Sequence, residues 1–177
     1  MAMAFADLLN AEARALAEDG VDVIQFDEPA FNVYMREVKE WGIEALHRAI
    51  DGLTCSTAVH ICYGYGIKAN IEWKATLGSQ WRQYEEIFPA LARSRIAQVS
   101  IECRNSRVPM ELLKLLEGKD VQVGAIDVAS DAVETPEQVA ATIGEAARYV
   151  AREKIIVIVP DGVRLLDVPR LERLAEI

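Results

Sequence analysis

Hydrophobic positions along the chain alternate between short apolar runs and longer stretches with helical spacing. The apolar runs predict five strands, at residues 21–26, 57–62, 96–102, 121–127 and 155–159. Leu8, Leu9, Ala13 and Leu16 recur at helical intervals and predict an opening amphipathic helix that ends at Gly20. Further helices are predicted over residues 33–50, near 80–93 with a kink or break at Pro89, after Pro109, and from Thr135 to about Val150.

This order of elements predicts an α/β fold. Strands that are almost wholly apolar and are separated by helices are typical of a parallel sheet covered by helices. Such a sheet is either open and doubly wound or part of a (β/α)₈ barrel. Gly64 and Gly66 lie between tyrosines and match neither a phosphate-binding loop nor a dinucleotide fingerprint. The 177 residues fall short of the roughly 250 that a whole barrel needs.

The charge balance and the cysteines narrow the class of protein. The chain has 19 basic and 28 acidic residues, a net charge of −9, which argues against nucleic acid and against anionic membranes as partners. The apolar stretches are shorter than the roughly 20 residues of a membrane span, and the first residues lack a positive region, so we expect a cytoplasmic protein. The odd set Cys55, Cys62 and Cys103 favours free thiols or metal ligands over disulfides.

Polar side chains gather where the predicted strands end, and they are the candidate site residues: Asp27 and Glu28, His60 and Cys62, Glu102, and Asp127. The carboxyl ends of neighbouring parallel strands meet at one edge of the sheet, which is where such folds carry their sites. These side chains are therefore expected around one opening.

His60 and Cys62 are two residues apart, so on a strand they share one face. Imidazole and thiolate are both good zinc ligands, and Glu102 on the next strand can add a third. The alternative is that the pair is a coincidence in a buried strand, where cysteine is common. Asp27 and Glu28 can equally cap the following loop or pair with an arginine, and Asp127 can belong to a turn.

Five segments in order carry a family resemblance: Ile24–Ala30 with Asp-Glu-Pro-Ala, Val59–Tyr63 with His-x-Cys, Ser100–Glu102, Gly124–Val128, and Val133–Glu137. Over about Ala11–Pro160 the chain resembles the catalytic barrel of cobalamin-independent methionine synthase and its shorter relatives. The resemblance implies a partial (β/α)₈ TIM barrel of about five parallel strands. It also implies a zinc-dependent methyltransferase that acts on the thiol of homocysteine.

Site residues follow from the same resemblance. His60, Cys62 and Glu102 correspond to zinc ligands, and Asp27 corresponds to the group that holds the substrate's ammonium. Glu28 and Asp127 are assigned to substrate binding beside it.

The chain also departs from the family pattern. The family's fourth ligand is a cysteine after the last strand, whereas Val159–Val163 contains none. Three ligands can hold zinc with substrate or water in the fourth position; alternatively the site is inactive. Ala129 stands where folate-using members carry a histidine, so the methyl donor is either methylfolate or a corrinoid. Residues 162–177 do not resemble the family, and we treat 1–177 as one partial barrel domain with a divergent tail.

The first three or so strand-helix units of the barrel have no counterpart in this sequence. Five strands cannot close an eight-stranded barrel, so we expect a homo-oligomer or a complementing chain. Two other functions stay open. The chain can be a catalytically inactive or incomplete fragment that acts only with a partner, or it can transfer methyl to another thiol such as coenzyme M.

Overall fold

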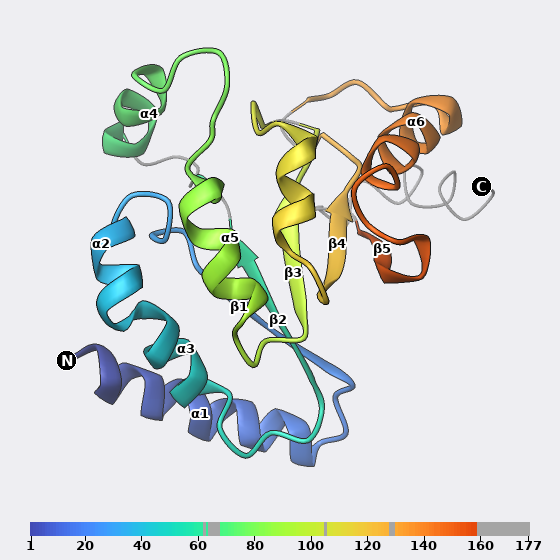
Figure 1. Ribbon diagram of the computed structural model, residues 1–177. Helices are drawn as coiled ribbons and strands as arrows, with labels where there is room; N and C mark the ends of the chain where they lie inside the picture. Colours follow the sequence, from blue (N-terminus) through green and yellow to red (C-terminus); the bar gives the residue numbers. More distant parts are fainter. Residues whose placement is uncertain (62, 64–67, 105, 128–129, 159–177) are drawn as a thin grey trace.

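Five parallel strands form one sheet in the computed structural model of the chain (Figure 1). The structure describes residues 1–61, 63, 68–104, 106–127 and 130–158, with the side chains of 69 and 70 excepted. The strands pair in chain order: β1 (Val23–Asp27), β2 (Ser56–Ile61), β3 (Gln98–Glu102), β4 (Asp120–Gly124) and β5 (Ile155–Ile158). The predicted α/β class with about five parallel strands is therefore confirmed.

A helix precedes β1, and further helical segments connect the strands. They are α1 (Ala2–Glu18), α2 (Met35–Glu37), the π-helical turn η1 (Val38–Gly42), α3 (Ile43–Ala49), α4 (Lys68–Ala75), α5 (Tyr84–Ala92), the 3₁₀ segment η2 (Met110–Leu115), α6 (Pro136–Ala146) and the 3₁₀ turn η3 (Arg152–Lys154). Within the residues described, no helix is both long and apolar enough to cross a membrane.

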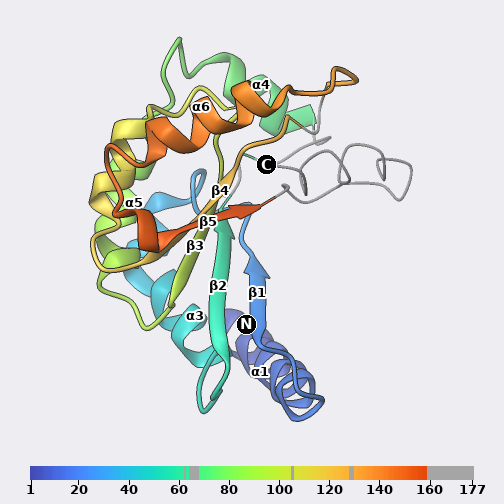
Figure 2. The ribbon, with the colours of Figure 1, turned by 90° about the vertical axis from the view of Figure 1, so that its right-hand side faces the viewer.

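One face of the sheet carries the hydrophobic core. Its strand residues are all buried: Val59, Ile61, Val99, Ile101, Val121 and Val123. They pack against apolar side chains of α3, α5 and η2, among them Leu46, Phe88 and Leu112. Figure 2 shows the sheet nearly edge-on with α3 and α5 on this side.

The opposite face of the sheet is polar. Residues paired in register across parallel strands point to the same side, and this face carries Gln25, His60, Gln98, Ser100, Glu102 and Gln122. The Gln122 amide donates to Gln98 Oε1 at 2.6 Å, and the Gln98 amide donates to Ser56 Oγ at 3.3 Å. A doubly wound sheet is covered by helices, and is apolar, on both faces. The polar face here argues against a doubly wound sheet and favours part of a barrel.

The sheet is part of a barrel rather than a closed one. In the part of the chain that the structure describes, β1 and β5 each pair on one side only. Five strands do not close a barrel whose strand number is eight.

Three helical segments differ from the sequence prediction. Pro89 lies inside α5 without ending it, because the flanking Phe88 and Leu91 are fully buried and packing holds the helix together. The helix predicted over 33–50 is interrupted by η1. Between β2 and α5 lies α4, a helix that was not predicted and that is supported by a Lys68–Glu72 pair at 3.7 Å.

The predicted apolar face of α1 is not buried by the described residues. Leu8 is 66% exposed, Leu9 48% and Leu16 42%, whereas Ala6 and Ala13 are buried. Helix α1 packs closely on α3, and the Asn10 amide donates to the carbonyls of Ala49 and Asp51 at 2.9 Å. The small side chains of Ala6 and Ala13 permit this close approach.

Candidate active site

The predicted site residues lie at the carboxyl ends of adjacent strands. Asp27 is the last residue of β1, His60 is on β2, and Glu102 is the last residue of β3. Asp27 and His60 are register partners, and His60 is in turn the partner of Ser100. Asp127 follows the end of β4 by three residues. The order of the strands therefore brings these groups to one edge of the sheet, as the sequence predicted.

His60 is buried on the polar face of the sheet, with 7% of its surface exposed. Its Nδ1 lies 2.9 Å from Ser100 Oγ, which is fully buried on the neighbouring strand. One ring nitrogen is thus engaged by the sheet itself. The other ring nitrogen, Nε2, is the one left to serve as a ligand or a proton carrier.

Glu102 is buried to the same degree as His60 and lies on the same face of the sheet. Alternation along β3 places Ser100 and Glu102 on one side, and Ser100 contacts His60 there. Burying a carboxylate is costly unless it is paired, hydrogen-bonded or bound to a metal. The Ser106 hydroxyl donates to the Glu102 carbonyl at 2.8 Å, which fixes the chain as it leaves β3.

Cys62, the third predicted metal ligand, lies outside the described residues. Within the described ranges, no three His, Cys, Asp or Glu side chains form a group that could hold a metal ion. His60 and Glu102 nevertheless fit zinc in their chemistry, because a neutral imidazole nitrogen and a carboxylate oxygen are both donors that zinc accepts.

Cys103 differs from a ligand in its surroundings. Its thiol packs against the core and donates to the Ile101 carbonyl at 3.6 Å. Burial raises the pKa of this thiol to about 12. Cys103 is next to Glu102 in sequence, so backbone alternation places the two side chains on opposite sides, and the packing of the thiol agrees.

Asp27 and Glu28 differ in burial although they are adjacent. Asp27 is exposed and accepts a hydrogen bond from the Gln25 amide at 3.0 Å. Glu28 is half-buried, and its Oε1 accepts the Ala30 N–H at 3.0 Å. Burial raises the pKa of the Glu28 carboxyl, an effect that this hydrogen bond opposes. The Glu28 N–H donates to the His60 carbonyl at 2.9 Å, so the segment after β1 is tied to β2.

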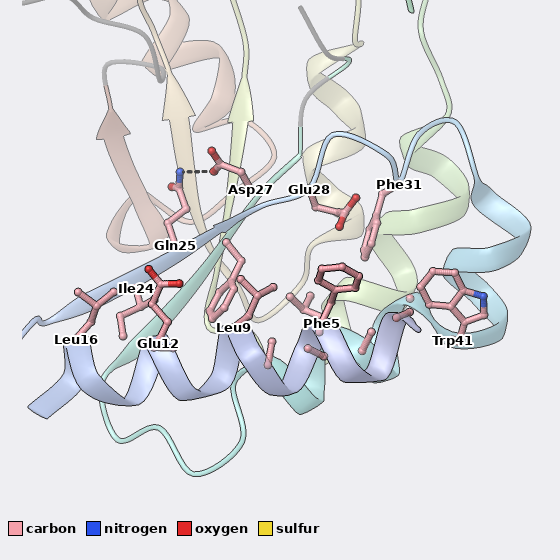
Figure 3. A pocket seen from close by; sticks show the side chains of 18 residues that line it. Phe5, Leu9, Glu12, Leu16, Ile24, Gln25, Asp27, Glu28, Phe31 and Trp41 are labelled. Carbon is pink, nitrogen blue, oxygen red and sulfur yellow. Dashed lines mark hydrogen bonds between the residues drawn. The ribbon is translucent and has the colours of Figure 1, made fainter.

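A groove of about 440 Å³ lies between α1, β1 and α3 (Figure 3). Asp27 and Glu28 line it, together with apolar side chains that include Phe5 and Leu9 of α1, Leu46 of α3 and Trp41 of η1. Phe5 is 61% exposed and Trp41 42% exposed. His60 and Glu102 do not line this groove. This groove was not predicted from the sequence, although the apolar face predicted for α1 indicated that this helix has a surface suited to packing.

Asp127 is held in a short polar turn. Its backbone N–H donates to Glu134 Oε1 at 2.6 Å, and its carbonyl accepts the Ser130 N–H at 3.3 Å. Residues 128 and 129 lie outside the described residues. The turn that the sequence offered as an alternative for Asp127 is therefore present, and it leaves the role of the carboxylate open to test.

Aromatic rings fix the chain just beyond β2. Tyr63 is buried and packs on Trp73, Trp81 and Tyr84, with ring centroids 5.8, 4.7 and 5.2 Å away. The Tyr84 hydroxyl donates to the Ile61 carbonyl at 2.7 Å. Trp73 and Trp81 thus serve packing, and their common partner is the residue that follows Cys62.

The chain is similar to known proteins along most of its length. The family profile described as "Cobalamin-independent synthase, Catalytic domain" matches residues 1–168. The methionine synthase of Sulfurisphaera tokodaii is 31% identical over 167 residues, which are 94% of this chain and 44% of that protein. The methionine synthase of Saccharolobus islandicus is 31% identical over 164 residues, which are 92% of this chain and 44% of that protein.

A solved structure is similar along almost the whole chain. It is a B12-independent methionine synthase from Shewanella sp. W3-18-1 in complex with selenomethionine. The two chains are 55% identical, with a TM-score of 0.87 over 98% of this chain and 52% of the Shewanella chain. The chain thus spans about half the length of the relatives that it matches.

Proposed function

The chain belongs to the family of cobalamin-independent synthase catalytic domains, and we propose that it supplies part of a barrel that methylates the thiol of homocysteine. The observation that carries this proposal is the placement of His60 and Glu102. Both are buried on the polar face of the sheet, at the carboxyl ends of neighbouring strands. The Shewanella relative was solved with selenomethionine, the selenium analogue of the methionine that this reaction would form.

His60, Cys62 and Glu102 would hold a zinc ion in this proposal. Zinc, when bound there, would favour the thiolate form of the substrate, which is the nucleophile. In the transfer itself, the thiol loses its proton and the sulfur–carbon bond to the methyl group forms. The bond between that methyl group and the donor breaks, and its electron pair stays with the donor.

Asp27, Glu28 and Asp127 would bind the ammonium group of the amino-acid substrate. Asp27 is accessible at the end of β1, and Glu28 lines the groove beside it. A cation next to Glu28 would favour its charged form and so oppose the effect of burial on its pKa. Together these carboxylates would recognise a small zwitterion by its positive end.

The other half of the barrel would pack against β1 and α1. Among the described residues one edge of β1 is unpaired and can accept another parallel strand, and the groove beside it exposes Phe5, Leu9 and Trp41. A complementing chain or a second copy of this chain would bury these side chains. The open edge also favours the second candidate function, a chain that is inactive until such a half is present.

Reconstitution tests this proposal. The chain is mixed with the part of the Shewanella relative that it does not cover, in the presence of zinc. Methionine formation from homocysteine is then measured with methyltetrahydrofolate and, separately, with methylcobalamin. We expect a complex by light scattering and methionine with one of the donors. A zinc-loaded complex that forms no methionine with either donor would contradict the proposal.

Two variants test whether the groove is the surface that contacts the added half of the barrel. Leu9→Asp places a charge in the groove and is expected to weaken association with the added half. Ile71→Asp is the matched control, because Ile71 is 55% exposed on α4 and does not line the groove. Equal weakening by both substitutions would argue against the groove as the contact surface.

A further inference from the structure

A buried serine of the central sheet contacts one of the candidate ligands. Ser100 lies in the middle of β3 with no exposed surface, and its Oγ is 2.9 Å from Nδ1 of His60. The two residues are register partners across the parallel pair of β2 and β3, although they are 40 positions apart in sequence. Strand pairing, rather than a loop, therefore fixes this contact.

The buried hydroxyl of Ser100 needs a hydrogen-bond partner. Its neighbours on β3, Val99 and Ile101, are buried in the core on the opposite face. A buried hydroxyl that lacks a hydrogen bond is destabilising, and the contact with His60 Nδ1 gives the Ser100 hydroxyl a partner. Alternation along β3 also places Glu102 on the same face as Ser100.

We propose that Ser100 is a positioning residue that fixes both the orientation of His60 and the ring nitrogen that binds metal. The proposal rests on the proposed function at one point, the role of His60 as a zinc ligand. A ring nitrogen engaged in a hydrogen bond cannot coordinate a metal at the same time. The contact with Ser100 therefore assigns Nε2 as the ligating nitrogen, with the proton on Nδ1 donated to Ser100 Oγ.

The direction of this hydrogen bond is the decisive feature. If the serine hydroxyl donated to Nδ1 instead, the ring proton would sit on Nε2 and block it as a ligand. The two arrangements are distinct tautomers of a neutral imidazole. Nitrogen-15 NMR distinguishes them, because the nitrogen that keeps its lone pair resonates far from the one that carries the proton.

The chain has an internal reference for this measurement. It contains two histidines, and Nε2 of His47 accepts the backbone N–H of Arg95 at 3.1 Å. When neutral, His47 must therefore carry its proton on Nδ1. We expect metal-free His60 to show the same tautomer as His47, and Ser100→Ala to abolish that preference at His60 alone. A His60 proton on Nε2 in the unmodified chain would overturn the proposal without any variant.

Zinc affinity gives the second readout. Ser100→Ala is expected to weaken zinc binding by about 10- to 100-fold, the usual effect of removing the partner of a ligating histidine. Ser100→Thr keeps the hydroxyl and is expected to restore the affinity. Ser56→Ala is the matched control, since Ser56 accepts from the Gln98 amide on the same face and does not contact His60.

The outcomes separate this inference from the proposed function. Unchanged zinc affinity in Ser100→Ala would overturn the positioning role and leave the zinc site standing. If the unmodified chain binds no zinc, the proposed function fails, and the tautomer of His60 alone decides the inference. An Nδ1–H tautomer that depends on Ser100 then supports it, and any other result overturns it.

Discussion

The hydrogen bond from Tyr84 to the Ile61 carbonyl offers a sharp test of how the end of β2 is held. The change is Tyr84→Phe, which removes one oxygen and keeps the ring. That ring is 1% exposed, and it packs on Tyr63 and Phe88 with centroids 5.2 and 4.5 Å away. The substitution therefore isolates the hydroxyl, which donates at 2.7 Å to the residue before Cys62.

The expected cost follows from burial. Water cannot readily replace the lost donor at a buried carbonyl, so the free energy of unfolding should fall by about 1–2 kcal/mol. For a chain of this length, that corresponds to a Tm lower by about 2–8 °C. Urea unfolding followed by circular dichroism should show an earlier midpoint with an unchanged slope.

Tyr34→Phe is the matched control for this measurement. Tyr34 is 58% exposed, so losing its hydroxyl should change the free energy of unfolding by less than about 0.5 kcal/mol. If Tyr84→Phe were as neutral as this control, the bond to Ile61 would contribute nothing. The reasoning that β2 is held at its carboxyl end by the Tyr84 hydroxyl would then be refuted.

Three further predictions concern α6, Glu28 and Cys103. Thr135→Ala should lower the free energy of unfolding by about 0.5–2 kcal/mol in urea melts, because Thr135 and Gln138 form a capping box at α6, and an unshifted midpoint would contradict this. The Glu28 pKa is raised in the folded chain, so the folded chain holds this proton more tightly than the unfolded chain, and the free energy of unfolding should fall as pH rises above about 4.5. Glu28→Gln should reduce this pH dependence in urea melts at several pH values. An equal pH dependence in the variant would contradict the prediction. Because burial raises the pKa of the Cys103 thiol to about 12, Cys103 should react with Ellman's reagent much more slowly than Cys55 in the folded chain. After unfolding, the two thiols should react at similar rates. Equal rates in the folded chain would contradict the buried placement of Cys103.

Much of the sheet could be predicted because parallel strands buried in a barrel wall read as apolar runs. The strand predicted at 57–62 is observed at Ser56–Ile61, and the strand predicted at 155–159 is observed at Ile155–Ile158. The polar inner face was harder to recognise. His60, Ser100 and Gln122 alternate with apolar residues on three strands, and only the register shows that they share one side.

Tertiary contacts explain most of the differences from the prediction. Pro89 was expected to kink or break its helix, and α5 continues through it without a break, with the buried Phe88 and Leu91 beside it. Local spacing cannot reveal such support. The apolar positions of α1 predicted an amphipathic helix, and Leu9 and Leu16 of that helix line the groove beside β1 while staying partly exposed. Their pattern is correct for a helix that another part of a barrel covers.

The candidate site was predictable residue by residue but not in its supporting contacts. His60 and Glu102 were identified from their positions at strand ends, and both lie buried there. Ser100 was missed as a partner, because a serine in an apolar strand carries no signal until the neighbouring strand is placed beside it. The alternation Ser100-Ile101-Glu102 would have put it on the face of Glu102.

The coordination of zinc in the purified chain is the most direct test of the proposed metal site at His60, Cys62 and Glu102. X-ray absorption at the zinc edge reports which donor atoms surround the metal and at what distances. If His60, Cys62 and Glu102 bind the metal, we expect one sulfur at about 2.3 Å with nitrogen and oxygen donors at about 2.0–2.2 Å. The sulfur should disappear in Cys62→Ser and remain in Cys103→Ser. Zinc with no sulfur neighbour, or no zinc bound at all, would contradict the account.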